Sequence, residues 1–503
     1  MKKPRRQGGK TVKKPLGRRG PGGYNRAEIF RKDVTSVTRD LTTGSPMGLI
    51  ANFALTTLFG MLFQQLYNMV DAMIVGKLLG AAALGGVGST GSINFFVIGF
   101  CMGVCNGFAI PVAQRMGANE PSEMRRFAAN AAWLSALFAA ALTLATGLLC
   151  RQILTVMRTP ADIFDHAYAY IFVIFMGIPA TFLYNLLAGI IRSLGDSKTP
   201  VYFLALSSVL NITLDFTLIL GFDAGVAGAA IATVASQGVS GLACLCYMVK
   251  KYPILRMTRE ERRPNLHACK VLCVMGIPMG LQYSITAIGS IVLQSSVNAL
   301  GSLYVTAVAA GAKVYQLLAC PFDAMGSTMA TYCGQNVGAC KLDRLSKGIR
   351  SCALLGLGYS LLALGAMLVF APRCAMLFLD PGELDAALLV KLTTRYILIQ
   401  SAFFFPLALV NIVRFSIQGM GFSPFAVLAG VLEMAARTGV GQVLVPMFGY
   451  TAACFASPAA WVCADLFLIP ASIACIARLR RLYPNVSVQD APEAVPLRAG
   501  AHH

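Results

Sequence analysis

Two side chains that can bind a cation or a proton lie one helical turn apart in an otherwise apolar stretch of the chain. Asn211 and Asp215 stand in the run Val209-Leu-Asn-Ile-Thr-Leu-Asp-Phe-Thr-Leu-Ile-Leu-Gly221, which is typical of a membrane-spanning helix. A carboxylate is costly to place in hydrocarbon, so an acid at such a position marks a functional site by default. The spacing therefore predicts that Asp215 belongs to a proton or cation site.

A second acid is expected at the same depth. Asp71 and Asp215 each lie six or seven residues before the end of an apolar run, which places both about 10 Å from the same membrane surface. Tyr170 and Thr233 fall in the same half of neighbouring runs. Because two adjacent acids in a dry site cannot both ionise cheaply, such a pair can take up a proton and release it when a cation or water enters. The predicted cation- or proton-binding site comprises Asp71, Tyr170, Asn211, Asp215 and Thr233; the alternative for Tyr170, Asn211 and Thr233 is simple hydrogen bonding between helices.

The second half of the chain carries an altered form of the same pair. Glu433 and Arg437 occupy the positions of Asn211 and Asp215 at an offset of 222 residues. A Glu followed four residues later by Arg can form an ion pair within one helix, which favours a structural bridge. Lys313 is expected at mid-membrane depth, where it could contact Glu433. The polar residues predicted to line a substrate cleft or polar site in this half are Gln282, Thr286, Lys313, Glu433 and Arg437, whereas the sequence suggests no role for Asp323 and Asp465.

The elements that must position these residues are membrane-spanning helices. The chain has 503 residues, of which 56% are hydrophobic and 13% charged. Twelve apolar runs reach the length of about 20 residues that crosses a bilayer. They cover Pro46–Leu78, Leu84–Ile110, Phe127–Leu149, Ala167–Ile191, Val201–Gly221, Val226–Met248, Val271–Leu300, Tyr304–Ala330, Ile349–Phe370, Thr394–Phe415, Pro424–Pro446 and Ala452–Ile476.

The two halves of the chain repeat each other at a separation of about 224 residues. Gln114 and Gln335 each begin a Gln-x-x-Gly-Ala turn, and Pro179 and Pro406 each interrupt the fourth run of their half. Six helices repeated as six predict an all-α polytopic membrane protein with two lobes, related by a pseudo-twofold axis along the membrane normal. The expected divisions are a basic tail (1–45), an N-terminal lobe (46–248), a linker (249–270), a C-terminal lobe (271–478) and a second tail (479–503).

The distribution of charge predicts that both tails and the linker are cytoplasmic. The formal net charge is +20, yet most Lys and Arg residues fall on one side of the predicted membrane. This is the positive-inside pattern, which makes the basic segment Lys2–Arg39 an orientation and lipid-contacting segment rather than a nucleic-acid-binding one. The few basic residues expected in outer loops are Lys77, Arg151, Arg158, Arg373 and Lys391.

Other chemistries find no support in the sequence. The 15 cysteines are scattered through apolar runs without a matching ligand pattern, so we expect no metal site. There is no phosphate-binding G-x-x-x-x-G-K-[ST] motif, and His166 and His267 are peripheral. We therefore expect no cofactor and no enzymatic activity, and look to H⁺ or Na⁺ as the coupling ion.

Several motifs together resemble the multidrug and toxic compound extrusion (MATE) family, in a bacterial drug-efflux branch. They are Gln65-Leu-Tyr-Asn-Met-Val-Asp71, the two Gln-x-x-Gly-Ala turns, Arg192-Ser-Leu-Gly-Asp196, and Asn211-x-x-x-Asp215 followed by Gly225-Val-Ala-Gly-Ala-Ala-Ile-Ala-Thr233. The resemblance implies two six-helix bundles in the bacterial inner membrane that exchange amphipathic, often cationic compounds for H⁺ or Na⁺. It also implies a cation site in the N-terminal lobe, a monomer, and lipids and small molecules as partners.

Two other functions compete with ion-coupled export. A flippase for lipid-linked saccharides is expected to have an arginine-lined cavity, whereas Arg437 is the only arginine that the runs place deep in the membrane. A membrane-embedded enzyme or receptor-like scaffold would need a catalytic cluster or an extramembrane domain, and the sequence indicates neither. Some branches of the family carry an acid in the seventh or tenth helix, and its absence here favours ion coupling in the N-terminal lobe.

Overall fold

The computed structural model describes residues 40–157, 159–378 and 386–483. The basic segment 2–39 and most of the C-terminal tail lie outside these residues, so the expectations for them stay predictions. The described chain is almost entirely helical. In chain order the elements are α2 (Pro46–Leu79), α3 (Ala81–Ser89), α4 (Gly91–Gly117), α5 (Pro121–Val156), α6 (Phe164–Met176), α7 (Ile178–Ser193), α8 (Lys198–Phe216), η1 (Thr217–Gly221), α9 (Gly225–Lys251), η2 (Pro253–Leu255), α10 (Leu266–Asn298), α11 (Ser302–Gly338), α12 (Asp343–Met376), α13 (Ala386–Ala402), α14 (Phe404–Gly419), α15 (Ser423–Gly439), η3 (Val440–Leu444), α16 (Val445–Phe448) and α17 (Tyr450–Leu482).

Up to twelve membrane spans are present in the described ranges, as the sequence predicts. Ten are single helices, and two are pairs bent by 48°, α6 with α7 and α13 with α14. Each bend lies beside a proline, Pro179 or Pro406, because proline removes a backbone donor and crowds the preceding turn. The second predicted run, Leu84–Ile110, differs: its first residues form the separate helix α3, and the span α4 begins at Gly91. Four glycines between positions 85 and 91 lower the helix propensity there.

The repeat appears in the backbone as well as in the sequence. The two bent pairs have the same angle, and the π-helical turns η1 and η3 occupy equivalent places after α8 and α15. Asn119 and Cys340, which end the two Gln-x-x-Gly-Ala turns, have positive φ angles of 59° and 55°. Equivalent turns in the two halves therefore close in the same way.

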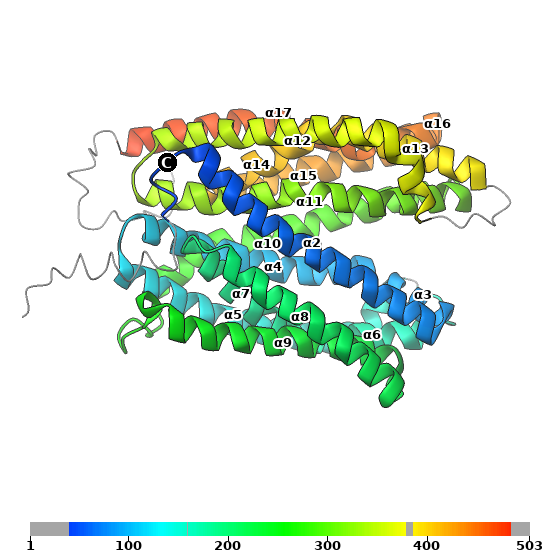
Figure 1. Cartoon of the computed structure of the whole chain (residues 1–503), viewed down its shortest axis with the longest axis horizontal. Helices are drawn as coiled ribbons and strands as arrows, with labels where there is room; N and C mark the ends of the chain where they lie inside the picture. The colour runs from blue at the N-terminus through cyan, green and yellow to red at the C-terminus, as the bar shows by residue number, and fades with distance from the viewer. Residues whose placement is uncertain (1–39, 158, 379–385, 484–503) are drawn as a thin grey trace, which may run out of the picture.

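Two helices connect the lobes. In Figure 1, α3 to α9 form one layer and α11 to α17 the other, while α2 passes from one layer to the other. Ile50 and Phe53 at the start of α2 pack in the core of the C-terminal lobe, and Ile74 and Val75 near its end pack in the core of the N-terminal lobe. The second connecting helix is α10, which packs closely on α4 of the N-terminal lobe, where Gly276 faces Gly107.

Both described ends of the chain and the linker after α9 lie at one end of the molecule, on the left in Figure 1, which we call the tail end. The linker is fixed to α5 by a buried carboxylate. Glu261 accepts two hydrogen bonds from Arg125, at 2.8 Å from Nε and 2.7 Å from Nη2, and one from Ser122 at 2.8 Å. The two lobes are therefore connected at the tail end by an ordered segment.

We expect Glu261→Gln to loosen this linker. Its hydrogen bonds with Arg125 lower the pKa of Glu261 from 4.5 to about 2, so its stabilising effect is complete above about pH 4.5 and is lost as the pH falls through about 2. At pH 7 the substitution should lower the free energy of unfolding by about 1–3 kcal/mol. Thermal unfolding at pH 7 checks this, with the exposed neighbour Glu260→Gln as the control. Equal melting temperatures for the two variants would show that the bridge contributes nothing.

Candidate functional site

The two acids expected to share a site meet in the N-terminal lobe. Asp71 comes from α2 and Asp215 from α8, and their carboxyl groups are close enough to share a hydrogen bond. Asp215 is fully buried and Asp71 is half-buried. Within the described residues, no basic side chain pairs with either acid, and neither Asp215 oxygen has a donor. Because ionised carboxylates only accept hydrogen bonds, the two groups can bond to each other only when one of them carries a proton.

The other three predicted residues surround this pair. Asn211 Nδ2 donates to Thr233 Oγ1 at 3.3 Å, and the Tyr170 side chain interacts electrostatically with both acids. The Asn211 amide oxygen is buried and has no donor among the described residues. The structure thus gathers all five residues around carboxyl and amide oxygens that lack protein donors. Such oxygens suit a proton or a hard cation such as Na⁺.

Sequence reasoning missed two members of this cluster. The Tyr67 hydroxyl is hydrogen-bonded to Gln237 and interacts with Asp71, and Thr181 Oγ1 donates to Gln237 Oε1 at 3.1 Å. Tyr67 precedes Asp71 by four residues, and Gln237 follows Thr233 by four. The one-turn spacing that singled out Asn211 and Asp215 would have found both.

The polar residues of the C-terminal lobe are arranged differently from the prediction. Glu433 pairs with Arg437, whose Nη2 lies 3.5 Å from Oε2, and more closely with Arg414. Lys313 is exposed, so its expected contact with Glu433 is wrong. Arg414 takes that place: it lies one residue inside the predicted run Thr394–Phe415, and α14 continues to Gly419 and leaves Arg414 only 5% exposed. Asp323 and Asp465 are electrostatic neighbours of Arg414.

The remaining predicted residues, Gln282 and Thr286, lie on α10, and Gln282 contacts Gly430 of α15, one turn before Glu433. Gln282 Oε1 accepts a hydrogen bond from Gln418 Nε2 at 2.6 Å, and both side chains are buried. Thr286 is half-buried one turn further along the helix. Of the five residues proposed for this half, Glu433 and Arg437 are the two that the structure joins in an ion pair within the described residues. Across the described ranges, no group of three or more His, Cys, Asp or Glu residues is arranged to hold a metal ion.

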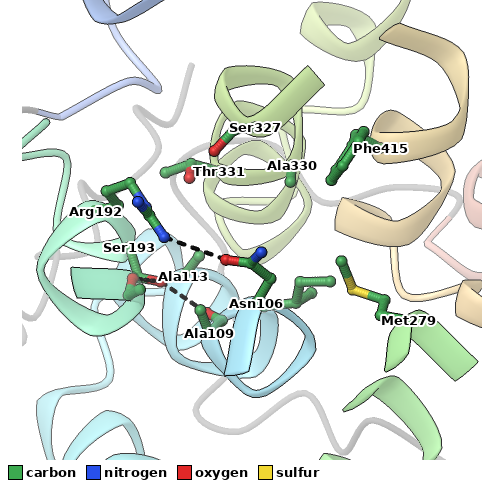
Figure 2. Close-up of a pocket in the computed structure, with 12 residues that line it drawn as sticks. Asn106, Ala109, Ala113, Arg192, Ser193, Met279, Ser327, Ala330, Thr331 and Phe415 are labelled. Carbon is green, nitrogen blue, oxygen red and sulfur yellow. Dashed lines mark hydrogen bonds between the residues drawn. The ribbon is translucent and has the colours of Figure 1, made fainter. Parts of the chain in front are cut away.

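A pocket lies between the lobes, lined by both of them (Figure 2). It is bordered by α4 and α7 on one side and by α10, α11 and α14 on the other. Arg192 is one of its lining residues, and its Nη2 donates to Asn106 Oδ1 at 3.1 Å. Arg437 is therefore not the only arginine inside the bundle, since Arg192 and Arg414 are there too. Arg192 is the first residue of the motif Arg192-Ser-Leu-Gly-Asp196, but the predicted run ends at Ile191 and so placed Arg192 outside the membrane.

Beyond this pocket, two reciprocal hydrogen bonds join the lobes at the tail end; we call them the tail-end closure. Gln114 Nε2 donates to the carbonyl of Gly419 at 3.0 Å, and Gln335 Nε2 donates to the carbonyl of Ser193 at 2.8 Å. The two glutamines are the repeated residues of the Gln-x-x-Gly-Ala turns. Glycine is needed three residues after each glutamine, because a Cβ there would collide with the backbone of the opposite glutamine.

Comparisons with known proteins agree with this architecture. The sequence model of the MatE family matches residues 57–217 and 278–442, one segment in each lobe. The probable multidrug resistance protein YpnP of Bacillus subtilis (strain 168) is 31% identical over 303 residues, which cover 59% of this chain and 67% of that protein. YoeA of the same organism, also a probable multidrug resistance protein, is 28% identical over 359 residues, covering 69% and 76%.

Comparison with solved structures also finds MATE family transporters. An outward-facing structure of a multidrug resistance MATE family transporter of the MOP superfamily superposes with a TM-score of 0.82 at 21% identity. The superposition covers 89% of this chain and 99% of that one, and it supports the arrangement of helices in two lobes. From the family model, which matches more than half of its residues, the chain belongs to the MatE family of membrane transporters.

Proposed function

We propose that the protein is an antiporter that exports amphipathic small molecules in exchange for H⁺ or Na⁺. The pair Asp71 and Asp215 carries the proposal, because it is a buried acidic site without a basic partner among the described residues. An unpaired buried carboxylate is unfavourable unless it binds a proton or a cation. Occupancy of the site by an ion therefore changes the charge inside the N-terminal lobe.

The course of α2 supports coupling between this charge and the arrangement of the lobes. Asp71 is on the half of α2 that packs in the N-terminal lobe, whereas Ile50 and Phe53 anchor the other half in the C-terminal lobe. A change in the position of α2 around Asp71 is thus transmitted to the interface by one continuous helix. Binding of an ion can shift the equilibrium between two arrangements only if its affinity for them differs, and this helix supplies a route to such a difference.

The tail-end closure supports transport by alternating access. Its two hydrogen bonds join opposite lobes, so a pathway to the tail end requires both to break. The distribution of Lys and Arg supports a cytoplasmic tail end in a bacterial inner membrane. In this proposal the lobes separate there to admit substrate from the cytoplasm, and the protein works as a monomer.

The proposed function is tested with purified protein in liposomes. An imposed pH gradient or Na⁺ gradient should drive uptake of norfloxacin or ethidium by inside-out-oriented protein, and collapse of the gradient should stop it. Uptake that is indifferent to both gradients would contradict antiport. The comparison of the two gradients also identifies the coupling ion.

A flippase for lipid-linked saccharides is the second candidate, and Arg192 in the inter-lobe pocket is the observation that favours it. Flipping of a fluorescent polyprenyl-diphosphate saccharide in the same liposomes, with no ion gradient, decides between the two. Rapid flipping together with absent drug uptake would replace the antiporter.

We expect Gln114→Ala combined with Gln335→Ala to open the tail end. Loss of two hydrogen bonds should shift the equilibrium by about 1–3 kcal/mol, or from several-fold to about a hundredfold. The measurement is labelling of Ser327→Cys by a membrane-impermeant maleimide, read for that peptide by mass spectrometry. Gln294→Ala is the control, because Gln294 bonds only to Asn298 of its own helix among the described residues. Unchanged labelling would mean that the closure does not hold the lobes together.

A further inference from the structure

The half-buried Arg192 differs from the arginines that are buried in the described helices. Arg414 and Arg437 share Glu433, and Arg115 pairs with Glu120. Within the described residues Arg192 has no ion pair, and its one side-chain hydrogen bond goes to the amide oxygen of Asn106. That bond orients the guanidinium and leaves its other N–H donors for a ligand. The groups that interact electrostatically with it are Tyr184, Tyr283 and Cys105, none of which is a carboxylate.

The rest of the polar lining also offers hydrogen-bond donors. Because the Asn106 oxygen accepts from Arg192, its amide nitrogen is free to donate. Ser327 and Thr331, one turn apart on α11, lie across from Arg192 in Figure 2. Neither hydroxyl has a hydrogen-bond partner in the part of the chain that the structure describes, whereas the neighbouring Thr328 donates to Ala324 O at 2.7 Å in the usual way. No Asp or Glu is among the lining residues.

The other walls are apolar, and the pocket adjoins the tail-end closure. Ile110, Met279 and Phe415 contribute hydrophobic surface beside the polar groups. Ser193, which follows Arg192, accepts the closure bond of Gln335. Asp323 lies one turn from Ser327 toward the opposite end, outside the lining, where it interacts with Arg414.

We propose that this pocket binds the carboxylate or phosphate group of an amphiphilic ligand, with Arg192 as the anchoring cation. A guanidinium pairs with a carboxylate or phosphate through two parallel hydrogen bonds, and Asn106, Ser327 and Thr331 supply further donors around the same space. The inference rests on the proposed function for its transport role, and it makes anionic amphiphiles a substrate class. A ligand held here touches both lobes beside the closure.

The test compares two xanthene dyes of opposite charge, carboxyfluorescein and rhodamine 6G, binding to the purified full chain in neutral-lipid nanodiscs by fluorescence anisotropy. The wild type should bind carboxyfluorescein more tightly. Arg192→Gln should weaken carboxyfluorescein binding at least tenfold and leave rhodamine 6G unchanged, while Arg192→Lys should restore part of the affinity. Arg151→Gln, an exposed arginine at the opposite end, is the control.

Three results would overturn the proposal: no preference of the wild type for the anionic dye, equal weakening of both dyes by Arg192→Gln, or no effect of that variant. Addition of phosphatidylglycerol to the nanodiscs distinguishes the source of the acidic group. Displacement of carboxyfluorescein by that lipid supports a lipid head group, and binding that it leaves intact supports a free solute. Because no ion gradient is used, failure of ion coupling leaves these results unaffected, and the two proposals fail separately.

Discussion

Asp215→Asn is expected to abolish gradient-driven transport while substrate binding persists. The carboxamide has nearly the shape of the carboxyl group but cannot take up or release a proton, and it is a weaker ligand for Na⁺. Since Asp215 is fully buried, solvent cannot replace the lost charge. Uptake into liposomes under an imposed ion gradient should fall to the level of protein-free liposomes, whereas binding of norfloxacin should stay within about twofold of the wild type.

Asp465→Asn is the matched control for this variant. It removes another buried carboxylate, but from the C-terminal lobe, where Arg414 is nearby. Gradient-driven uptake should continue in it at a rate that follows the amount of folded protein. If Asp465→Asn abolished coupling and Asp215→Asn did not, the coupling site would lie in the other lobe.

Glu433→Gln is expected to cause the largest loss of stability. The substitution leaves Arg414 and Arg437 buried beside each other, without the carboxylate that both of them contact. Removing one partner of a buried ion pair costs about 3–5 kcal/mol, which is a large part of the stability of most proteins. We expect little folded protein by size-exclusion chromatography in detergent, and a clearly lowered melting temperature for what remains.

Lys313→Gln is the control for Glu433→Gln. Lys313 is exposed and has no ion pair within the described ranges, so its substitution should change the free energy of unfolding by no more than about 0.5 kcal/mol. The combination of Glu433→Gln with Arg437→Gln should recover part of the lost yield, because one unpaired charge is removed. A Glu433→Gln protein as stable as the wild type would show that the two arginines are solvated rather than held by Glu433.

Much of the helical framework could be predicted because long apolar runs and proline positions are local features. The bends beside Pro179 and Pro406 and the grouping of Asp71 with Asp215 followed from such features. Arg414 was overlooked although it lies inside the predicted run Thr394–Phe415, because hydropathy locates the end of a run only to within a few residues and Arg414 is one residue from that end. The bonds from Gln114 to Gly419 and from Gln335 to Ser193 could not be predicted, since no periodicity shows which surfaces of two lobes meet.

The chain also shows what a repeat can and cannot predict. The equivalence of Asn211 with Glu433 and of Asp215 with Arg437 correctly placed both pairs one turn apart in α8 and α15. It carried no information about their neighbours, and these differ: Thr233 and Asp71 lie beside the first pair, whereas Arg414 lies beside the second. Equivalent positions in the two lobes therefore differ in charge and in environment.

The most direct test of the central claim measures the ion rather than the substrate. Norfloxacin is added to purified protein in a weakly buffered, Na⁺-controlled solution, and the release of H⁺ or Na⁺ is recorded by a pH-sensitive dye and a Na⁺-selective electrode. The wild type should release one of the two ions in proportion to the substrate bound. The variant that combines Asp71→Asn with Asp215→Asn should bind the substrate and release neither ion. Release of the same amount of ion by this variant would show that Asp71 and Asp215 are not the coupling site.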